Sequence, residues 1–126
     1  MSRSRHVLVV DQDEGTRELV AAILEDRGYR VSRAVDGAMM RQILTGEEDV
    51  DAIIMDASLR GEASASLAEH AKGLRLPLVM ISGNDLVMGY AAEHGLQLLR
   101  KPFRIRDLCD ALDQAFASGE FGQKEI

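Results

Sequence analysis

The sequence is poor in aromatic residues, in cysteine and in positive charge. It has two Tyr, three Phe and no Trp, so aliphatic side chains must build the hydrophobic core. Its single cysteine, Cys109, excludes an internal disulfide and favours a reducing, cytoplasmic location. A formal net charge of -6 argues against direct binding to nucleic acid, because such domains carry a basic surface. No apolar run approaches the ~20 residues of a membrane-spanning helix, so we expect no membrane segment.

What the chain does have is aliphatic sequence in short, regular segments. Of its 126 residues, 46% are hydrophobic, which is enough for the core of one domain. Apolar runs alternate with segments whose apolar residues recur at helical spacing. We expect strands at 6–11, 29–34, 50–55, 77–82 and 96–99, and helices at 14–27, 36–44, 67–74, 85–94 and 105–116. Five strand–helix units predict an α/β domain over 1–118, with a parallel sheet covered on both faces. The polar segment 119–126 is predicted to be a tail or the start of a linker.

Four polar side chains stand at the ends of predicted strands. Asp11 and Asp56 each close an apolar run, Ser82 closes another, and Lys101 follows the last strand. Because the carboxyl ends of parallel strands meet at one edge of the sheet, we expect these side chains to lie close together. Together they suit phosphoryl transfer. One carboxylate can attack phosphorus, the other can hold a hard cation, and the hydroxyl and ammonium groups can bind the remaining oxygens.

With these residues in place, the sequence resembles the response-regulator receiver domain, the phosphoacceptor of two-component signalling, over about residues 6–117. The matching stretches are Val7-Leu8-Val9-Val10-Asp11, Ile53-Ile54-Met55-Asp56, Met80-Ile81-Ser82-Gly83 and Lys101-Pro102-Phe103. The resemblance implies a flavodoxin-like fold, a doubly wound five-stranded parallel sheet of strand order 2-1-3-4-5. It also implies a bacterial cytoplasmic signalling protein that is not an enzyme, although it contributes to its own phosphorylation and dephosphorylation.

The resemblance also implies a role for each polar residue. Asp56 is the expected phosphoacceptor, Ser82 the switch hydroxyl and Lys101 the ammonium group that contacts the phosphoryl group. The implied cofactor is Mg²⁺, held by Asp11, Asp56 and the backbone carbonyl of Ser58. The peptide bond after Lys101 is expected to be cis, as it is in the family.

The implied partners follow from the same family. A histidine kinase or a phosphotransfer protein would donate the phosphoryl group, and a downstream protein or an attached effector domain would receive the signal. The surface from about 85 to 116 is expected to change its affinity for that target. A homodimer through the fourth and fifth helices is compatible with the sequence, whereas direct contact with nucleic acid or membrane is not expected.

Several positions depart from the family pattern. Gln12 replaces the usual second acid, and its amide oxygen can still ligate Mg²⁺ but brings no charge, so weaker Mg²⁺ binding is expected. Asp13 is acidic, but it is also well placed as the N-cap of the first helix. Leu98 stands where a switch aromatic is common. Arg60 replaces a usual Pro and 62–66 lacks the usual Gly, which predicts an irregular loop there.

Two other functions remain open from the sequence alone. Gln12 and Leu98 are compatible with a receiver-like binding module that works without phosphorylation, for which Asp56 would be irrelevant. The motif Asp11-Gln12-Asp13 resembles the nucleophile and acid/base pair of haloacid-dehalogenase-type phosphatases. The phosphatase interpretation is the weaker one, because the acids that follow Lys101 lie on a predicted helix rather than at a strand end, and because Asp56 is left unexplained.

Overall fold

The computed structural model describes residues 4–46, 49–59, 64–83 and 97–124. Its five strands form one parallel sheet in the order β2-β1-β3-β4-β5, which confirms the predicted fold class. The strands are β1 (His6–Val10), β2 (Arg30–Ala34), β3 (Ala52–Asp56), β4 (Leu78–Ser82) and β5 (Gln97–Arg100). The helices are α1 (Glu14–Asp26), α2 (Gly37–Leu44), α3 (Ser64–Gly73) and α5 (Ile105–Lys124). The helix expected at 85–94 and residues 60–63 of the loop expected to be irregular lie outside the described residues. Residues 64–66, expected to belong to that irregular loop, are helical and begin α3.

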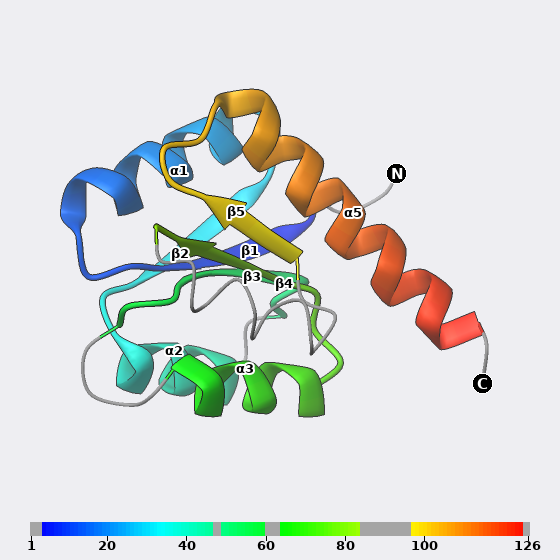
Figure 1. Cartoon of the computed structure of the whole chain (residues 1–126). Coiled ribbons are helices and arrows are strands. Elements are labelled where there is room, and N and C mark those ends of the chain that lie inside the picture. The colour runs from blue at the N-terminus through cyan, green and yellow to red at the C-terminus, as the bar shows by residue number, and fades with distance from the viewer. Residues whose placement is uncertain (1–3, 47–48, 60–63, 84–96, 125–126) are drawn as a thin grey trace.

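Helices cover both faces of the sheet, α1 and α5 on one and α2 and α3 on the other (Figure 1). Successive residues of a strand point to opposite faces, and β1 shows this clearly. Val7 and Val9 pack in the core on the α1 and α5 side, whereas Leu8 and Val10 pack in the core on the α2 and α3 side. The three central strands are buried along their whole length, which explains their continuous apolar sequences. In the part of the chain that the model describes, no helix is long and apolar enough to cross a membrane.

The start and end of α1 follow from side-chain and backbone chemistry. Asp13 is the N-cap, as predicted: its carboxylate accepts hydrogen bonds of 2.8 Å from the backbone N–H and the hydroxyl of Thr16. These two bonds lower the pKa of Asp13. After the helix, Gly28 has φ of +92°, a left-handed conformation that glycine adopts without strain. The turn that leads into β2 is thereby formed where the sequence predicted it.

Not every apolar residue of the helices is buried. Leu19 is 56% exposed and Met39 is also exposed. On α1 the buried positions are Val20, Ala21 and Leu24, and Leu19 is about 100° around the helix from Val20, so it points away from the sheet. Ile105 is 53% exposed at the start of α5.

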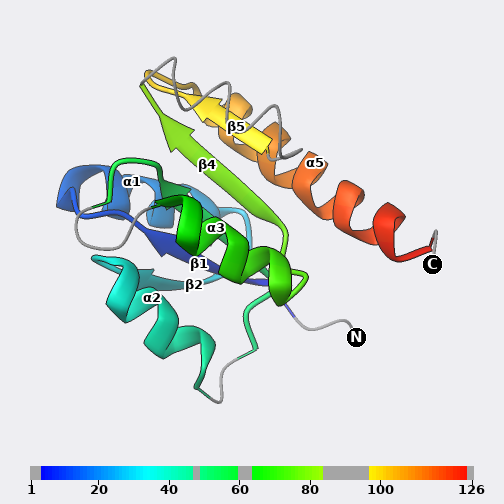
Figure 2. The same cartoon turned by 60° about the horizontal axis from the view of Figure 1, so that its bottom comes forward.

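The last helix is also longer than predicted, because α5 runs to Lys124 instead of stopping near residue 116. The segment after Ser118 is polar but contains no proline that would block continuation of a helix. Figure 2 shows the last turns of α5 passing beyond the sheet. The polar segment expected as a tail or linker is therefore helical over most of its length.

An aromatic stack holds α5 at the amino end of the sheet. The buried ring of Phe116 lies parallel to that of Tyr29, with an interplanar angle of 4° and centroids 6.4 Å apart. The guanidinium of Arg5 lies 4.0 Å from the centroid of the Phe116 ring. Such stacking and cation–π contacts add to the burial of the ring itself. Segments that precede β1 and β2 thus fix one point of α5.

A buried histidine joins β1 to β2 and to the segment before β3. The Nδ1 atom of His6 is 2.9 Å from the carbonyl oxygen of Asp49, and its Nε2 is 2.6 Å from Oγ of Ser32. The backbone N–H of His6 donates to Asp51 at 2.7 Å. Because a carbonyl only accepts, Nδ1 carries a proton and donates it to the carbonyl of Asp49.

Replacing Ser32 with alanine is expected to lower the free energy of unfolding by about 1–2 kcal/mol, because the buried Nε2 of His6 loses this partner. Urea unfolding at neutral pH measures the effect. Ser118→Ala, at an exposed serine of α5, is the matched control and is expected to change little. Equal effects of the two substitutions would contradict a stabilising role of the His6 network.

Candidate functional site

The carboxyl ends of four neighbouring strands bring the predicted polar residues together. Asp11 follows β1, Asp56 ends β3, Ser82 ends β4 and Lys101 follows β5. The side chain of Lys101 donates to Oδ2 of Asp56 at 3.3 Å, and its backbone N–H donates to the carbonyl of Ser82 at 2.9 Å. Asp11 and Asp56 are only 2% and 4% exposed, and Ser82 is buried beside them. The four residues therefore meet at one edge of the sheet, as the strand ends predicted.

Asp56 is held in its ionised form by three donors. Its Oδ1 accepts from the backbone N–H and from the hydroxyl of Ser58, both at 2.8 Å, and its Oδ2 accepts from Lys101. Burial acts to raise the pKa of Asp56, but the hydrogen bonds from Ser58 and the charge of Lys101 outweigh it, so that the pKa is lowered. At neutral pH this carboxylate is therefore a buried anion.

Asp11 differs from Asp56 because its surroundings raise its pKa. Its Oδ1 accepts from the backbone N–H of Asp13 at 2.8 Å, whereas its Oδ2 is buried and has no hydrogen-bond partner among the described residues. Burial raises the pKa of Asp11, and the nearby charge of Asp56 adds to the increase. A buried carboxylate oxygen without a partner is unfavourable, and a bound cation is a common way to satisfy it.

The oxygen atoms at this edge fit a hard divalent cation. Asp11 and Asp56 could supply carboxylates and Ser58 could supply a backbone carbonyl, all ligands that Mg²⁺ prefers. The unpartnered Oδ2 of Asp11 is the observation that favours such a site. Over the described residues there is no group of three or more His, Cys, Asp or Glu side chains that could hold a metal. With two carboxylates only, the site carries less charge than a set of three acids would.

Gln12 contributes a donor that the sequence did not predict. Its side-chain Nε2 donates to the carbonyl oxygen of Ser58 at 3.4 Å, across 46 residues of sequence. The contact lies at the exposed mouth of the site and joins the loop after β1 to the loop after β3. From the sequence, only the amide oxygen of Gln12 was expected to have a role, because the orientation of a side chain between two loops is not visible in a sequence.

Arg17 is a further residue that sequence analysis missed. Its guanidinium donates to the backbone carbonyl of Asp11 at 3.0 Å, and most of the side chain is buried. It therefore fixes the position of the loop that carries Asp11. Its position in the sequence gave one indication. Arg17 lies near the start of α1, where the helix dipole disfavours a positive charge, so a specific hydrogen-bonding role for this side chain could be expected.

Comparison with known proteins identifies the family. A family model described as the response regulator receiver domain matches residues 7–113. The chain belongs to this family. Receiver domains of response regulators interact with histidine kinases and effector domains, and they are in general signalling domains rather than enzymes. The phosphatase interpretation of Asp11-Gln12-Asp13 is therefore set aside.

This receiver domain has relatives among longer regulators. It is 35% identical to the aerobic respiration control protein ArcA of Escherichia coli over 109 residues, which cover 82% of this chain and 44% of ArcA. It is 30% identical to the transcriptional regulatory protein GltR of Pseudomonas aeruginosa over 131 residues, covering 97% of this chain and 53% of GltR. The chain thus spans about half the length of these relatives.

Solved structures agree with the fold. The receiver domain of NtrX from Brucella abortus is 28% identical, with a TM-score of 0.78 over 88% of this chain and 98% of that one. The signal receiver domain of an HD domain-containing protein from Pseudomonas fluorescens Pf-5 has a TM-score of 0.85. That match covers 100% of this chain and 96% of that one. At 21% identity, the second match supports the fold alone.

Leu98 on β5 departs from the family pattern, whereas the peptide bond that follows β5 agrees with it. Leu98 is half-buried and packs on the α2 and α3 side, so no aromatic ring is available at this position. The peptide bond between Lys101 and Pro102 is cis, as the resemblance implied.

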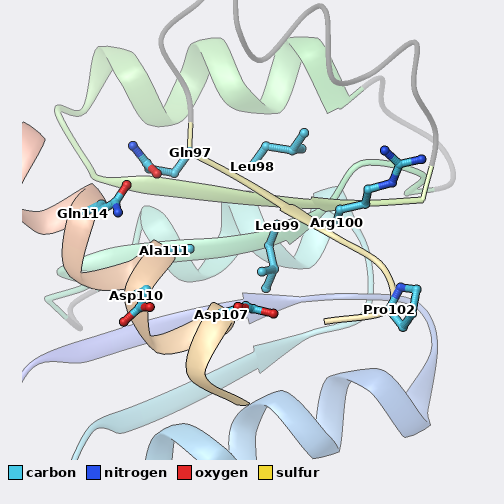
Figure 3. A pocket seen from close by; sticks show the side chains of 9 residues that line it. All are labelled: Gln97, Leu98, Leu99, Arg100, Pro102, Asp107, Asp110, Ala111 and Gln114. Atoms are coloured by element: carbon cyan, nitrogen blue, oxygen red, sulfur yellow. The ribbon is translucent and has the colours of Figure 1, made fainter. Parts of the chain in front are cut away.

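Next to the site, β5 and α5 border a groove of about 380 Å³. In Figure 3, Leu99 of β5 points to the α5 side, where Asp107 and Asp110 lie, whereas Leu98 and Arg100 point the other way.

Proposed function

We propose that this receiver domain accepts a phosphoryl group on Asp56 from a histidine kinase or a phosphotransfer protein, in a Mg²⁺-dependent reaction. The observation that carries the proposal is the environment of Asp56, a buried carboxylate kept ionised by Ser58 and Lys101 next to a second carboxylate. An ionised carboxylate is the form that attacks phosphorus. A cytoplasmic location agrees with this role and with the single cysteine.

In the proposed reaction, a carboxylate oxygen of Asp56 forms a bond to the phosphorus of a phosphohistidine. The phosphorus–nitrogen bond breaks, and its electron pair remains on the imidazole of the donor. Ser58 holds Oδ1 of Asp56 through two hydrogen bonds, which orients the carboxylate. Lys101 and Ser82 then supply an ammonium group and a hydroxyl group for the phosphoryl oxygens. A cation held by Asp11, Asp56 and the Ser58 carbonyl would neutralise charge on those oxygens.

The proposed output surface lies along β5 and α5. The backbone N–H of Lys101 donates a hydrogen bond to the carbonyl of Ser82, which connects the two residues expected to contact the phosphoryl group. Lys101 also directly follows β5. The groove between β5 and α5 belongs to this surface, which would change its affinity for a downstream protein or an attached effector domain. A homodimer through the same surface is one form that this output can take.

The test is an intact-mass time course with the small phosphodonor acetyl phosphate. We expect a single phosphoryl adduct that forms in the presence of Mg²⁺ and does not form when EDTA is present from the start. A receiver domain of known activity, labelled under the same conditions, shows that the donor is competent. No adduct on this chain while the control is labelled would favour the module that works without phosphorylation, which the residues Gln12 and Leu98 support.

A further inference from the structure

One hydrogen bond at the mouth of the site uses an oxygen that the proposed metal site also needs. The Nε2 of Gln12 donates to the carbonyl of Ser58 at 3.4 Å. The same carbonyl completes the set of oxygens formed with Asp11 and Asp56. The amide of Gln12 and a cation bound to Ser58 would thus share one acceptor oxygen.

The orientation of this amide follows from elementary hydrogen-bond chemistry. A carbonyl oxygen only accepts, so the group that faces Ser58 must be the NH₂ of Gln12. The amide oxygen of Gln12 lies on the opposite branch of the same planar group. To act as a ligand of a cation at Ser58, the side chain of Gln12 must first turn its amide over, which breaks the observed contact.

We propose that Gln12 competes with the divalent cation for the carbonyl of Ser58 and must leave that carbonyl before metal binds. The NH₂ group carries partial positive charge and occupies part of the space next to the oxygen, where Mg²⁺ requires near-ideal octahedral geometry. The amide connects the loops after β1 and β3, as a cation held by Asp11, Asp56 and Ser58 would. This inference rests on the metal site of the proposed function.

The competition differs from a simple loss of charge. A carboxylate at position 12 cannot donate to the Ser58 carbonyl, so the usual acid would leave that oxygen to the metal. Glutamine both removes a charged ligand and adds a competing donor. If only the missing charge mattered, shortening Gln12 to alanine would leave Mg²⁺ binding unchanged or make it weaker. If the donor competes, the same substitution makes binding tighter.

The test is direct Mg²⁺ binding to the unphosphorylated full chain, measured by titration calorimetry. We expect Gln12→Ala to bind Mg²⁺ about two- to fivefold more tightly than the wild type, the size expected for losing one weak, exposed hydrogen bond. Gln12→Glu is expected to bind more tightly still, because it also restores a charge. Gln42→Ala is the matched control: this exposed glutamine lies in the last turn of α2, toward the opposite end of the sheet, and is expected to have no effect.

A second measurement follows the loops without metal. In EDTA, hydrogen exchange of Ala57–Leu59 is expected to be faster in Gln12→Ala than in the wild type, and saturating Mg²⁺ is expected to remove the difference. Weaker or unchanged Mg²⁺ binding by Gln12→Ala would overturn the competition while leaving the metal site in place. No Mg²⁺ binding by the wild type or by any variant would overturn the metal site and the competition together.

Discussion

The Asp56→Asn variant is expected to take up no phosphoryl group, either from acetyl phosphate or from a phosphorylated kinase. Asparagine has nearly the same shape and can still accept the two hydrogen bonds from Ser58, so the fold should be kept. Its neutral amide is a far weaker nucleophile than a carboxylate, and it no longer forms an ion pair with Lys101. Intact-mass spectrometry under conditions that label the wild type completely should therefore show no adduct.

The matched control is Asp36→Asn. Asp36 stands at the same edge of the sheet, after β2, and its side chain caps α2 by accepting from the backbone N–H of Met39 at 2.9 Å. Asparagine caps helices about as well as aspartate, so this variant should fold and be labelled like the wild type. Full labelling of Asp56→Asn would show that another residue is the phosphoacceptor and would refute the proposed role of Asp56.

The Asp11→Asn variant is expected to be more stable than the wild type in the absence of metal, by about 1–2 kcal/mol at neutral pH. In the wild type, the buried charge of Asp11 lies near that of Asp56, and one of its oxygens has no partner among the described residues. Asparagine removes the charge while its oxygen can still accept from the backbone of Asp13. The same substitution is expected to abolish Mg²⁺ binding, because it removes one of two carboxylates.

The stability gain should depend on pH in a defined direction. Burial, together with the charge of Asp56, raises the pKa of Asp11 above its ordinary value of 3.8. Below pH 3.8, where the side chain is protonated in both states, Asp11 makes its full contribution to the free energy of unfolding. This contribution is lost as the pH rises through the raised pKa of the folded state. Asparagine does not titrate, so the advantage of Asp11→Asn should be largest at neutral pH and should shrink in acid.

Urea unfolding in EDTA at several pH values measures this difference. Asp56 has a lowered pKa, so its own contribution is present above 3.8 and is lost as the pH falls through the lowered value. Comparing variant with wild type at each pH largely removes that common effect. A variant that is no more stable than the wild type at neutral pH would contradict the view that the buried charge of Asp11 lowers the free energy of unfolding.

The layout of the sheet and the position of the site were predictable because both follow from local sequence. The central strands are buried on both faces, so they appear as uninterrupted apolar runs, and Asp11 and Asp56 interrupt those runs at their ends. Once the strands are parallel, all their carboxyl ends must share one edge. The N-cap role of Asp13 was visible for the same reason, since it depends only on the next three residues.

What escaped prediction depends on side-chain direction or on contacts between distant segments. Leu19 belongs to an apolar cluster in the sequence, but its exposure is set by the phase of α1 against the sheet. The partners of His6 lie 26 and 43 residues away, on segments whose alignment is known only after folding. The contact of Gln12 with Ser58 depends on which branch of an amide faces a loop. None of these follows from periodicity or spacing.

The stack of Phe116 on Tyr29 gives α5 a pivot inside its length. Counting 1.5 Å per residue, Phe116 lies about 16 Å from the first residue of the helix and about 12 Å from Lys124. Ile105 begins the helix just after Lys101–Pro102, next to the acidic site, and the pivot lies at the amino end of the sheet. A sideways shift of ~2 Å at the first turn would therefore swing the far end by about 1.5 Å in the opposite direction. Leu108 and Leu112 hold the first half of α5 in the core, so a displacement beside Asp56 would reach the last turns of α5 only if these side chains shift with it.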